Sequence, residues 1–322
     1  MQKEILTIRN LKTSFHTQDG TARAIDGLDF SVNHREIVGV VGESGCGKSV
    51  TALSIMRLVP NPPGEIESGE IYFEGEDLLR LSENEMRKIR GNKISMVFQE
   101  PMVYLNPVLT VGDQISEPIR LHQGLSRTQA LDRVIELLRS VEIPSPEERI
   151  RNYPHQMSGG MRQRTMIAMA ISCHPKLLIA DEPTTALDVT IQLQILNVMR
   201  KLRDDLGTTI ILITHNLGIV AEMVDKVIVM YAGKVVEDSP VKDLFEKPYH
   251  PYTTGLLKSI PRLDQKRRRL HIIPGNVPNI LNLPDGCVFN DRCEQRLKRC
   301  LSEHPPLFEI GAQRFCRCWL YS

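Results

Sequence analysis

The sequence predicts an α/β fold built on a largely parallel sheet, and three observations support this prediction. Over residues 1–260, short β-rich runs alternate with helical patterns, as in parallel sheets flanked by helices. One glycine-rich segment follows such a run directly and opens a helix. Another apolar run ends in two adjacent carboxylates, at the end of a strand where ligands bind in such sheets. The predicted strands are 37–41, 94–98, 177–180, 209–213 and 227–230, and helices are expected after Gly47, Ser158 and Val189.

Length, charge and hydropathy narrow the class of protein. A chain of 322 residues with 41% hydrophobic residues is predicted to be globular, with one or two domains. Its net charge of +1 disfavours nucleic acid as a partner, because duplex-binding proteins carry a basic excess on one face. No stretch approaches the roughly 20 apolar residues of a membrane span, and residues 1–4 lack the apolar core of a signal peptide. We therefore expect any association with a membrane to depend on partner subunits.

Residues 42–49 carry the clearest chemical signal. They read Gly-Glu-Ser-Gly-Cys-Gly-Lys-Ser and fit the pattern G-x-x-x-x-G-K-[ST] between a predicted strand and a predicted helix. In such a loop the backbone N–H groups face phosphates, Lys48 is expected to reach the β and γ phosphates, and Ser49 is expected to ligate Mg²⁺. The nucleotide-binding residues predicted here are Gly42, Ser44, Gly45, Cys46, Gly47, Lys48, Ser49 and Val50.

Cys46 invites a separate prediction. A helix N-terminus lowers the pKa of a nearby thiol, so we expect alkylation of Cys46 to inhibit the protein and ATP to protect against it.

The predicted strand 177–180 leads into Asp181 and Glu182. Because the carboxyl ends of parallel strands face the ligand crevice, both acids are placed to meet a Mg-nucleotide. Asp181 is suited to hold the metal through water, and Glu182 is suited to polarise an attacking water.

Residues 153–164 resemble the signature segment of the ABC-transporter ATPases, a family that the chain resembles over residues 1 to 260. They read Tyr-Pro-His-Gln-Met-Ser-Gly-Gly-Met-Arg-Gln-Arg, with Met161 where the family commonly has Gln. The resemblance implies a RecA-like core with an antiparallel β subdomain and an α-helical subdomain. It also implies a head-to-tail pair of domains, with each ATP between the loop at Gly42 of one and Ser158, Gly159 and Gly160 of the other.

The same resemblance implies roles for single residues. Gln99 matches the glutamine that touches Mg²⁺ and water, and His215 matches the switch histidine near the γ-phosphate. Phe15 matches the aromatic residue that stacks on adenine, and residues 186–188 resemble the loop that crosses the dimer interface. The family hydrolyses ATP, and the catalytic residues carried over by position are Glu182, His215, Gln99 and Lys48.

From residue 261 onward the composition changes, and we predict a second domain over residues 261–322. The basic run 266–269 and the Pro-rich stretch after it favour a solvated linker, with contact to anionic headgroups as the alternative. In a chain without a secretory signal, clustered cysteines favour metal over disulfides, and four thiolates suit Zn²⁺ or an iron–sulfur cluster. A tail this short has too small a hydrophobic core to fold without a bound metal or cluster that stabilises it. The tail cysteines are Cys287, Cys293, Cys300, Cys316 and Cys318.

This tail resembles the C-terminal extension of the oligopeptide and dipeptide permease ATPases, as does the run Lys-Pro-Tyr-His-Pro-Tyr-Thr at 247–253. The resemblance favours a structural [4Fe–4S] cluster over Zn²⁺ or free thiols, and alignment on residues 319–320 favours Cys318 over Cys316. The implied ligands are Cys287, Cys293, Cys300 and Cys318.

The resemblance also implies an importer of di- or oligopeptides at the cytoplasmic face of the cell membrane. Its partners would be two transmembrane permease subunits, a second ATPase subunit that is related rather than identical, and indirectly a peptide-binding protein. The alternatives are an importer ATPase for another solute such as nickel and an ABC ATPase acting on ribosomes or DNA. A P-loop kinase would leave residues 158–160 unexplained, and a module that binds ATP without hydrolysis would leave Glu182 and His215 unexplained.

Overall fold

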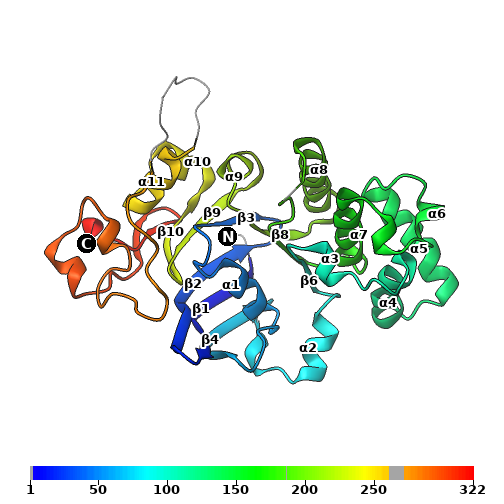
Figure 1. Ribbon diagram of the computed structural model, residues 1–322, viewed down its shortest axis with the longest axis horizontal. Helices are drawn as coiled ribbons and strands as arrows, with labels where there is room; N and C mark the ends of the chain where they lie inside the picture. Colours follow the sequence, from blue (N-terminus) through cyan, green and yellow to red (C-terminus); the bar gives the residue numbers. More distant parts are fainter. Residues whose placement is uncertain (1–2, 186, 261–271) are drawn as a thin grey trace. The chain divides into compact units, whose positions relative to one another are not determined.

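The computed structural model describes residues 3–185, 187–260 and 272–322 (Figure 1). The chain divides into two compact units. The first unit consists mainly of Asn33–Ile37 and Arg80–Ile213, and the second of Glu4–Val32, Val38–Leu79 and Thr214–Ser322. Each unit is thus assembled from segments that are distant in the chain. The basic run 266–269 lies outside the described residues. In the part of the chain that is described, no helix has the length and apolarity needed to cross a bilayer.

Three parallel strands organise the first unit. The central strand β7 pairs with β6 on one side and with β8 on the other, in the register Leu177↔Thr209 through Asp181↔Ile213 for the second pair. Every residue of these strands is buried, as expected for parallel strands covered on both faces. The elements of this unit are α2 (Glu83–Ile89), β6 (Ile94–Val97), α3 (Pro101–Tyr104), α4 (Val111–Gln123), α5 (Arg127–Ser140), α6 (Pro146–Arg149), α7 (Gly159–Ile171), β7 (Leu177–Asp181), α8 (Val189–Leu206) and β8 (Thr209–Ile213).

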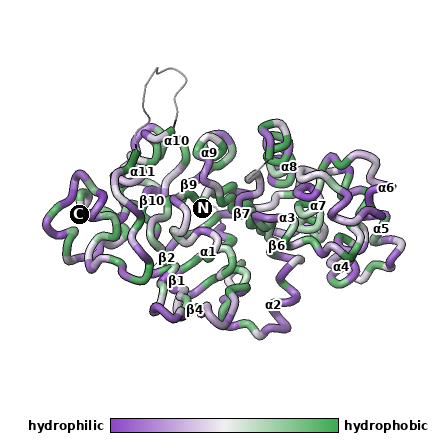
Figure 2. The backbone as a smooth tube through the Cα atoms, viewed as in Figure 1, coloured by the Kyte–Doolittle hydropathy of each residue, from purple (hydrophilic) through white to green (hydrophobic). Residues whose placement is uncertain are grey.

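Side-chain caps mark where the helices of the first unit begin. The Ser158 hydroxyl accepts from the N–H of Met161 at the start of α7, and the Asp188 carboxylate accepts from the N–H of Ile191 at the start of α8. The sequence predicts helices after Ser158 and Val189, and the structure starts α7 at Gly159 and α8 at Val189. Ser158 and Asp188 stabilise these starts because their side chains satisfy N–H groups that the first turn leaves open. Helix α2 is largely hydrophilic along its length (Figure 2), and the residues that it buries are Met86 and Ile89.

The second unit contains an antiparallel sheet and a group of strands around β9. The antiparallel sheet has the order β2-β1-β4-β5, and this is the antiparallel β subdomain implied by the family resemblance. In the other group, β9 runs parallel to β3 but antiparallel to β10. The elements of this unit are β1 (Glu4–Thr17), β2 (Gly20–Asn33), β3 (Ile37–Val41), α1 (Lys48–Ile55), β4 (Gly64–Phe73), β5 (Glu76–Asp77), α9 (Leu217–Met223), β9 (Lys226–Tyr231), β10 (Lys234–Pro240), α10 (Val241–Glu246), α11 (Pro251–Lys258), β11 (Phe308–Gly311) and β12 (Arg314–Cys316).

The cysteine extension, residues 272–322, adds strands to this second unit. Strand β12 pairs antiparallel with β10, in the register Glu237↔Cys316 and Asp238↔Phe315, and β11 pairs with β12. Cys287 and Cys293 flank a short 3₁₀ helix, Asn290–Arg292. The extension therefore shares hydrogen bonds with the strand group at β9 and β10, and the predicted domain boundary at residue 261 stays a prediction.

Candidate nucleotide site and cysteine extension

The phosphate loop lies between the end of β3 and the start of α1, as the sequence predicts. Gly42 has a φ of 153° and Gly47 a φ of 103°, a region that L side chains rarely adopt. A Cβ on Gly42 would overlap the carbonyl oxygen of Met230, and one on Gly47 would lie 2.5 Å from the carbonyl oxygen of Ala24. Glycine is required at both positions because neighbouring backbone leaves no room for a side chain.

Lys48 folds back onto the loop that precedes it. Its side chain is buried, and Nζ donates to the carbonyl of Gly42 at 2.8 Å and to that of Glu43 at 3.1 Å. The predicted partners Ser44, Gly45 and Ser49 are exposed, whereas Val50 is half-buried in α1. The loop therefore presents its hydroxyls and part of its backbone to solvent while Lys48 rests on backbone carbonyls.

The prediction that the Cys46 thiol has a lowered pKa is wrong. Cys46 is fully buried, and burial raises the pKa of its thiol although Lys48 acts in the opposite direction. Loss of hydration outweighs the field of the helix N-terminus, so this thiol is not activated. Cys46 can contribute its backbone to the loop, but its side chain packs inside it.

In the first unit the structure brings Gln99 and Glu182 together. Nε2 of Gln99 donates to the Glu182 carboxylate at 3.1 Å, and the Thr185 hydroxyl donates to the same oxygen at 2.8 Å. Glu182 directly follows Asp181, the buried last residue of β7, and has a φ of 45°. For a residue with a side chain this backbone conformation costs about 1–2 kcal/mol, and such strain clusters at functional sites.

The signature residues lie at the start of α7. Ser158 caps the helix and is exposed, and Gly159 is exposed with no atom within 4 Å of a Cβ built on it. A Cβ on Gly160 would lie 3.0 Å from Cγ2 of Ile191 in α8. The open face at Gly159 leaves the first N–H groups of α7 accessible to an anion. Ala186, the first residue of the predicted interface loop, lies outside the described residues.

Two further predicted residues belong to the second unit. His215 follows β8 in the chain and is exposed. Phe15 is half-buried in β1, where it pairs with Gly64 of β4. The site residues are thus divided between the two units: the phosphate loop, Phe15 and His215 lie in the second, and Gln99, Ser158, Asp181 and Glu182 lie in the first.

Four cysteines of the extension lie in one neighbourhood. The N–H of Cys287 donates to the carbonyl of Cys300 at 2.8 Å. Burial, together with the nearby thiols of Cys300, Cys318 and Cys293, raises the pKa of the Cys287 thiol to about 11. Burial likewise raises the pKa of Cys318 to about 11, with Cys293 and Cys300 among its neighbours.

The described residues show no arrangement that holds a metal. Among them, no three His, Cys, Asp or Glu side chains are placed so that they could coordinate one ion. Cys316 is fully buried in β12, and its electrostatic neighbours among the cysteines are Cys318 and Cys287. The structure therefore gathers the cysteines named by the sequence without showing the predicted metal site.

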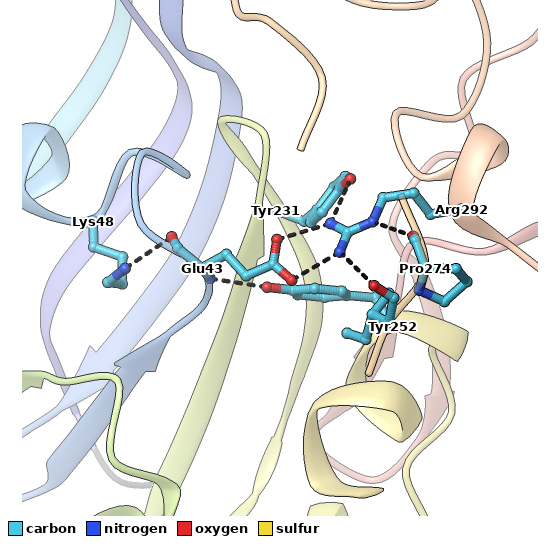
Figure 3. Close-up of polar contacts among 7 residues, drawn as sticks. Glu43, Lys48, Tyr231, Tyr252, Pro274 and Arg292 are labelled. Atoms are coloured by element: carbon cyan, nitrogen blue, oxygen red, sulfur yellow. Dashed lines mark hydrogen bonds and ion pairs between the residues drawn. The ribbon is translucent and has the colours of Figure 1, made fainter. Parts of the chain in front are cut away.

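Sequence reasoning missed two residues beside the phosphate loop. Arg292 of the extension pairs with the carboxylate of Glu43, and the Tyr252 hydroxyl of α11 accepts from the N–H of Glu43 (Figure 3). In the sequence Tyr252 belongs to the 247–253 motif, and no sequence pattern connects Glu43 with Arg292, a residue 249 positions away.

A cavity of about 400 Å³ lies elsewhere, among α5, α7 and α8. None of the predicted site residues lines it. Its lining carries both acidic and basic side chains, and Arg133 pairs there with Glu136 at 2.5 Å.

Known proteins resemble the chain along nearly its whole length. The ABC transporter family model matches residues 25–185, and the model of the oligopeptide/dipeptide transporter C-terminal region matches residues 236–300. The chain is 52% identical to the probable peptide ABC transporter ATP-binding protein y4tR of Sinorhizobium fredii, over 98% of this chain and 94% of that protein. It is 51% identical to the oligopeptide transport ATP-binding protein AppD of Bacillus subtilis, over 98% and 97%. The solved dimer of the ATP-binding cassette MJ0796, in a post-hydrolysis state bound to ADP and Pi, has a TM-score of 0.67 and 26% identity over 73% of this chain and 98% of that chain.

Proposed function

The chain belongs to the ATP-hydrolysing subunits of ABC transporters, in the branch with the oligopeptide/dipeptide C-terminal region, and we propose that it powers the import of di- or oligopeptides. The observation that carries this proposal is the match of residues 236–300 to the oligopeptide/dipeptide transporter C-terminal region, because the match over residues 25–185 is to ABC transporters in general. The names of y4tR and AppD, which are similar over almost their full lengths, support the same cargo.

In this proposal three residues have separate roles in hydrolysis: Lys48, Glu182 and His215. Lys48 leaves the carbonyls of Gly42 and Glu43 and pairs with the β and γ phosphates of ATP. Glu182, oriented by hydrogen bonds from Gln99 and Thr185, polarises the attacking water. His215 contributes a polar contact near the γ-phosphate, and Phe15 stacks on the adenine.

The residues assigned to Mg²⁺ are Ser49, Gln99 and Asp181. Each offers an oxygen, the donor that this hard cation prefers, and the Asp181 side chain is only slightly exposed at the end of β7. When bound, Mg²⁺ would neutralise charge on the transferred phosphoryl group.

The open helix start at residues 158–160 supports a dimer as the working form. We propose that Ser158 and the N–H groups of Gly159 and Gly160 bind the ATP held by the phosphate loop of a second, related ATPase subunit. The MJ0796 cassette is a dimer in its solved structure, which supports a paired arrangement. Two transmembrane permease subunits would hold the pair at the cytoplasmic face of the membrane, and a peptide-binding protein would deliver the cargo.

For the cysteine extension we propose a structural [4Fe–4S] cluster on Cys287, Cys293, Cys300 and Cys318, with Zn²⁺ as the alternative. The mutual proximity of these thiols supports one shared site, and thiolates are the usual ligands of both groups. Absorbance of the anaerobically purified chain, with iron, sulfide and zinc assays, tests this. A band near ~400 nm with about four irons supports the cluster, and one zinc without colour refutes it.

Transport in proteoliposomes tests the main proposal. The chain is assembled with its permease subunits and partner ATPase, and uptake of a labelled dipeptide and a labelled pentapeptide is measured with ATP inside or outside. Glu182→Gln is the matched control, which should bind ATP but lower turnover by about 100-fold or more, the usual contribution of a general base. ATP-driven uptake of nickel but of neither peptide would refute peptide import, and near-normal turnover of Glu182→Gln would remove its assigned role.

A further inference from the structure

One buried arginine joins the cysteine extension to the phosphate loop. The Arg292 side chain is 6% exposed, and its guanidinium donates from Nη1 to Oε2 of Glu43 at 2.8 Å and from Nη2 to Oε1 at 3.1 Å (Figure 3). Two parallel hydrogen bonds between a planar guanidinium and a carboxylate make a strong and directional pair. Glu43 is the second residue of the phosphate loop, so this pair connects two segments 249 residues apart.

Arg292 is held in place by its other neighbours. Its Nε–H donates to the carbonyl of Pro274 at 2.9 Å, and Nη1 donates to the Tyr231 hydroxyl at 3.3 Å. The ring of Phe289 packs edge-on against that of Tyr231, with centroids 5.2 Å apart. Because the donors of a guanidinium form a fixed fork, these contacts set the plane in which Arg292 meets Glu43.

Glu43 is in turn held at three points. Its N–H donates to the Tyr252 hydroxyl at 2.9 Å, its carboxylate pairs with Arg292, and its carbonyl accepts from Nζ of Lys48 at 3.1 Å. Figure 3 shows these contacts running from Lys48 through Glu43 to Arg292. The orientation of the peptide that supports Lys48 therefore depends on contacts from α11 and from the extension.

The charge of Glu43 gives the pair a second consequence. A carboxylate in a loop that binds phosphates repels the negatively charged ligand, and this repulsion grows where water is partly excluded. The Glu43 side chain is only 27% exposed, so solvent screens it incompletely. Pairing with Arg292 neutralises this charge without removing the hydrogen bonds that shape the loop.

We propose that Arg292 is a positioning residue for ATP: by pairing with Glu43 it neutralises that carboxylate and holds the phosphate loop in the shape that accepts a nucleoside triphosphate. Arg292 itself has no contact with the reacting atoms in this proposal. The inference goes beyond the proposed function, because it concerns affinity for ATP and holds for any transported solute.

Titration calorimetry of Mg-ATP into the purified full chain tests the proposal without any transport step. Arg292→Gln should raise the Kd for ATP by about tenfold, the effect of one uncompensated charge near the ligand. Arg292→Lys keeps the positive charge but loses the two parallel hydrogen bonds of the guanidinium, so it should raise the Kd for ATP by about threefold. The matched control is Arg317→Gln, a second arginine of the extension, whose side chain is 13% exposed, donates to the carbonyl of Val235 and pairs with Asp29 instead of Glu43. It should change the Kd by less than about twofold.

A double-mutant cycle separates positioning from a general role in folding. In a Glu43→Gln background no charge remains to be neutralised, so adding Arg292→Gln should change the Kd by less than about twofold. An equal tenfold loss in both backgrounds would overturn the proposal, as would an unchanged Kd for Arg292→Gln or an equal loss for Arg317→Gln. In the assembled transporter, Arg292→Gln should raise KM for ATP by about tenfold and leave kcat within about twofold, and a fall confined to kcat would also overturn it. Urea unfolding of each variant shows that it is folded under the assay conditions.

Discussion

Replacing Gly159 by alanine should separate what this glycine does for the fold from what it does for ATP. Gly159 is the first residue of α7, its φ is not positive, and a Cβ built on it meets no atom within 4 Å. Alanine is favoured over glycine in a helix by about 1 kcal/mol. We therefore expect the free energy of unfolding of the isolated chain to be unchanged or to rise by up to about 1 kcal/mol.

The same methyl group should be harmful when two ATPase subunits close on ATP. The proposed dimer brings a phosphate within hydrogen-bond distance of the N–H groups at the start of α7, and a methyl group on Gly159 occupies part of that approach. Losing one hydrogen bond to a charged group costs about 1.5–3 kcal/mol. The ATPase rate of the assembled transporter should therefore fall by about 10- to 100-fold, whereas ATP affinity of the isolated chain should stay within about twofold.

Gly160→Ala is the matched control for the fold. Its Cβ would lie 3.0 Å from Cγ2 of Ile191, so this variant should lose about 1–3 kcal/mol of stability as well as activity. Urea unfolding monitored by circular dichroism gives the stabilities, and phosphate release gives the ATPase rates. The reasoning is refuted if Gly159→Ala destabilises the chain by more than about 1 kcal/mol, or if its assembled ATPase rate stays within about twofold of the unchanged protein.

Two further predictions concern buried groups. Cys46 should react with iodoacetamide about tenfold more slowly in the folded chain than in urea, because burial shields its thiol and raises its pKa; mass spectrometry of its peptide measures this, and equal rates would contradict it. Burial lowers the pKa of His250 from 6.5 to about 3, so its neutral form stabilises the fold above pH 6.5 and this stabilisation is lost as the pH falls from 6.5 towards 3. At pH 5 the loss relative to pH 7 should be about 2 kcal/mol. His250→Asn keeps a cap for α11 but removes the titration, so urea unfolding at both pH values should show the smaller loss in the variant, and equal losses would refute this role.

Residues close together in the chain were the ones that the sequence placed correctly. The phosphate loop needs glycines at 42 and 47 because backbone carbonyls crowd those positions. Both glycines belong to the eight-residue motif at 42–49, so the sequence alone reveals them. The starts of α7 and α8 follow from Ser158 and Asp188, whose side chains cap the next turn. Local hydrogen bonding and backbone sterics decide such features, so a short window of sequence is enough to predict them.

Contacts between distant segments were decided by the tertiary structure alone. The sequence could name Cys46 as a loop residue, but only packing shows that its thiol is buried and therefore has a raised pKa. Likewise, β12 joins β10, and Arg292 meets Glu43 across 249 residues, although neither segment carries a pattern that specifies the other. The pairing of β10 with β12 and of Glu43 with Arg292 depends on where the fold places whole helices and strands. The energy of a buried charge depends on the side chains and backbone that surround it, and these come from several segments of the chain.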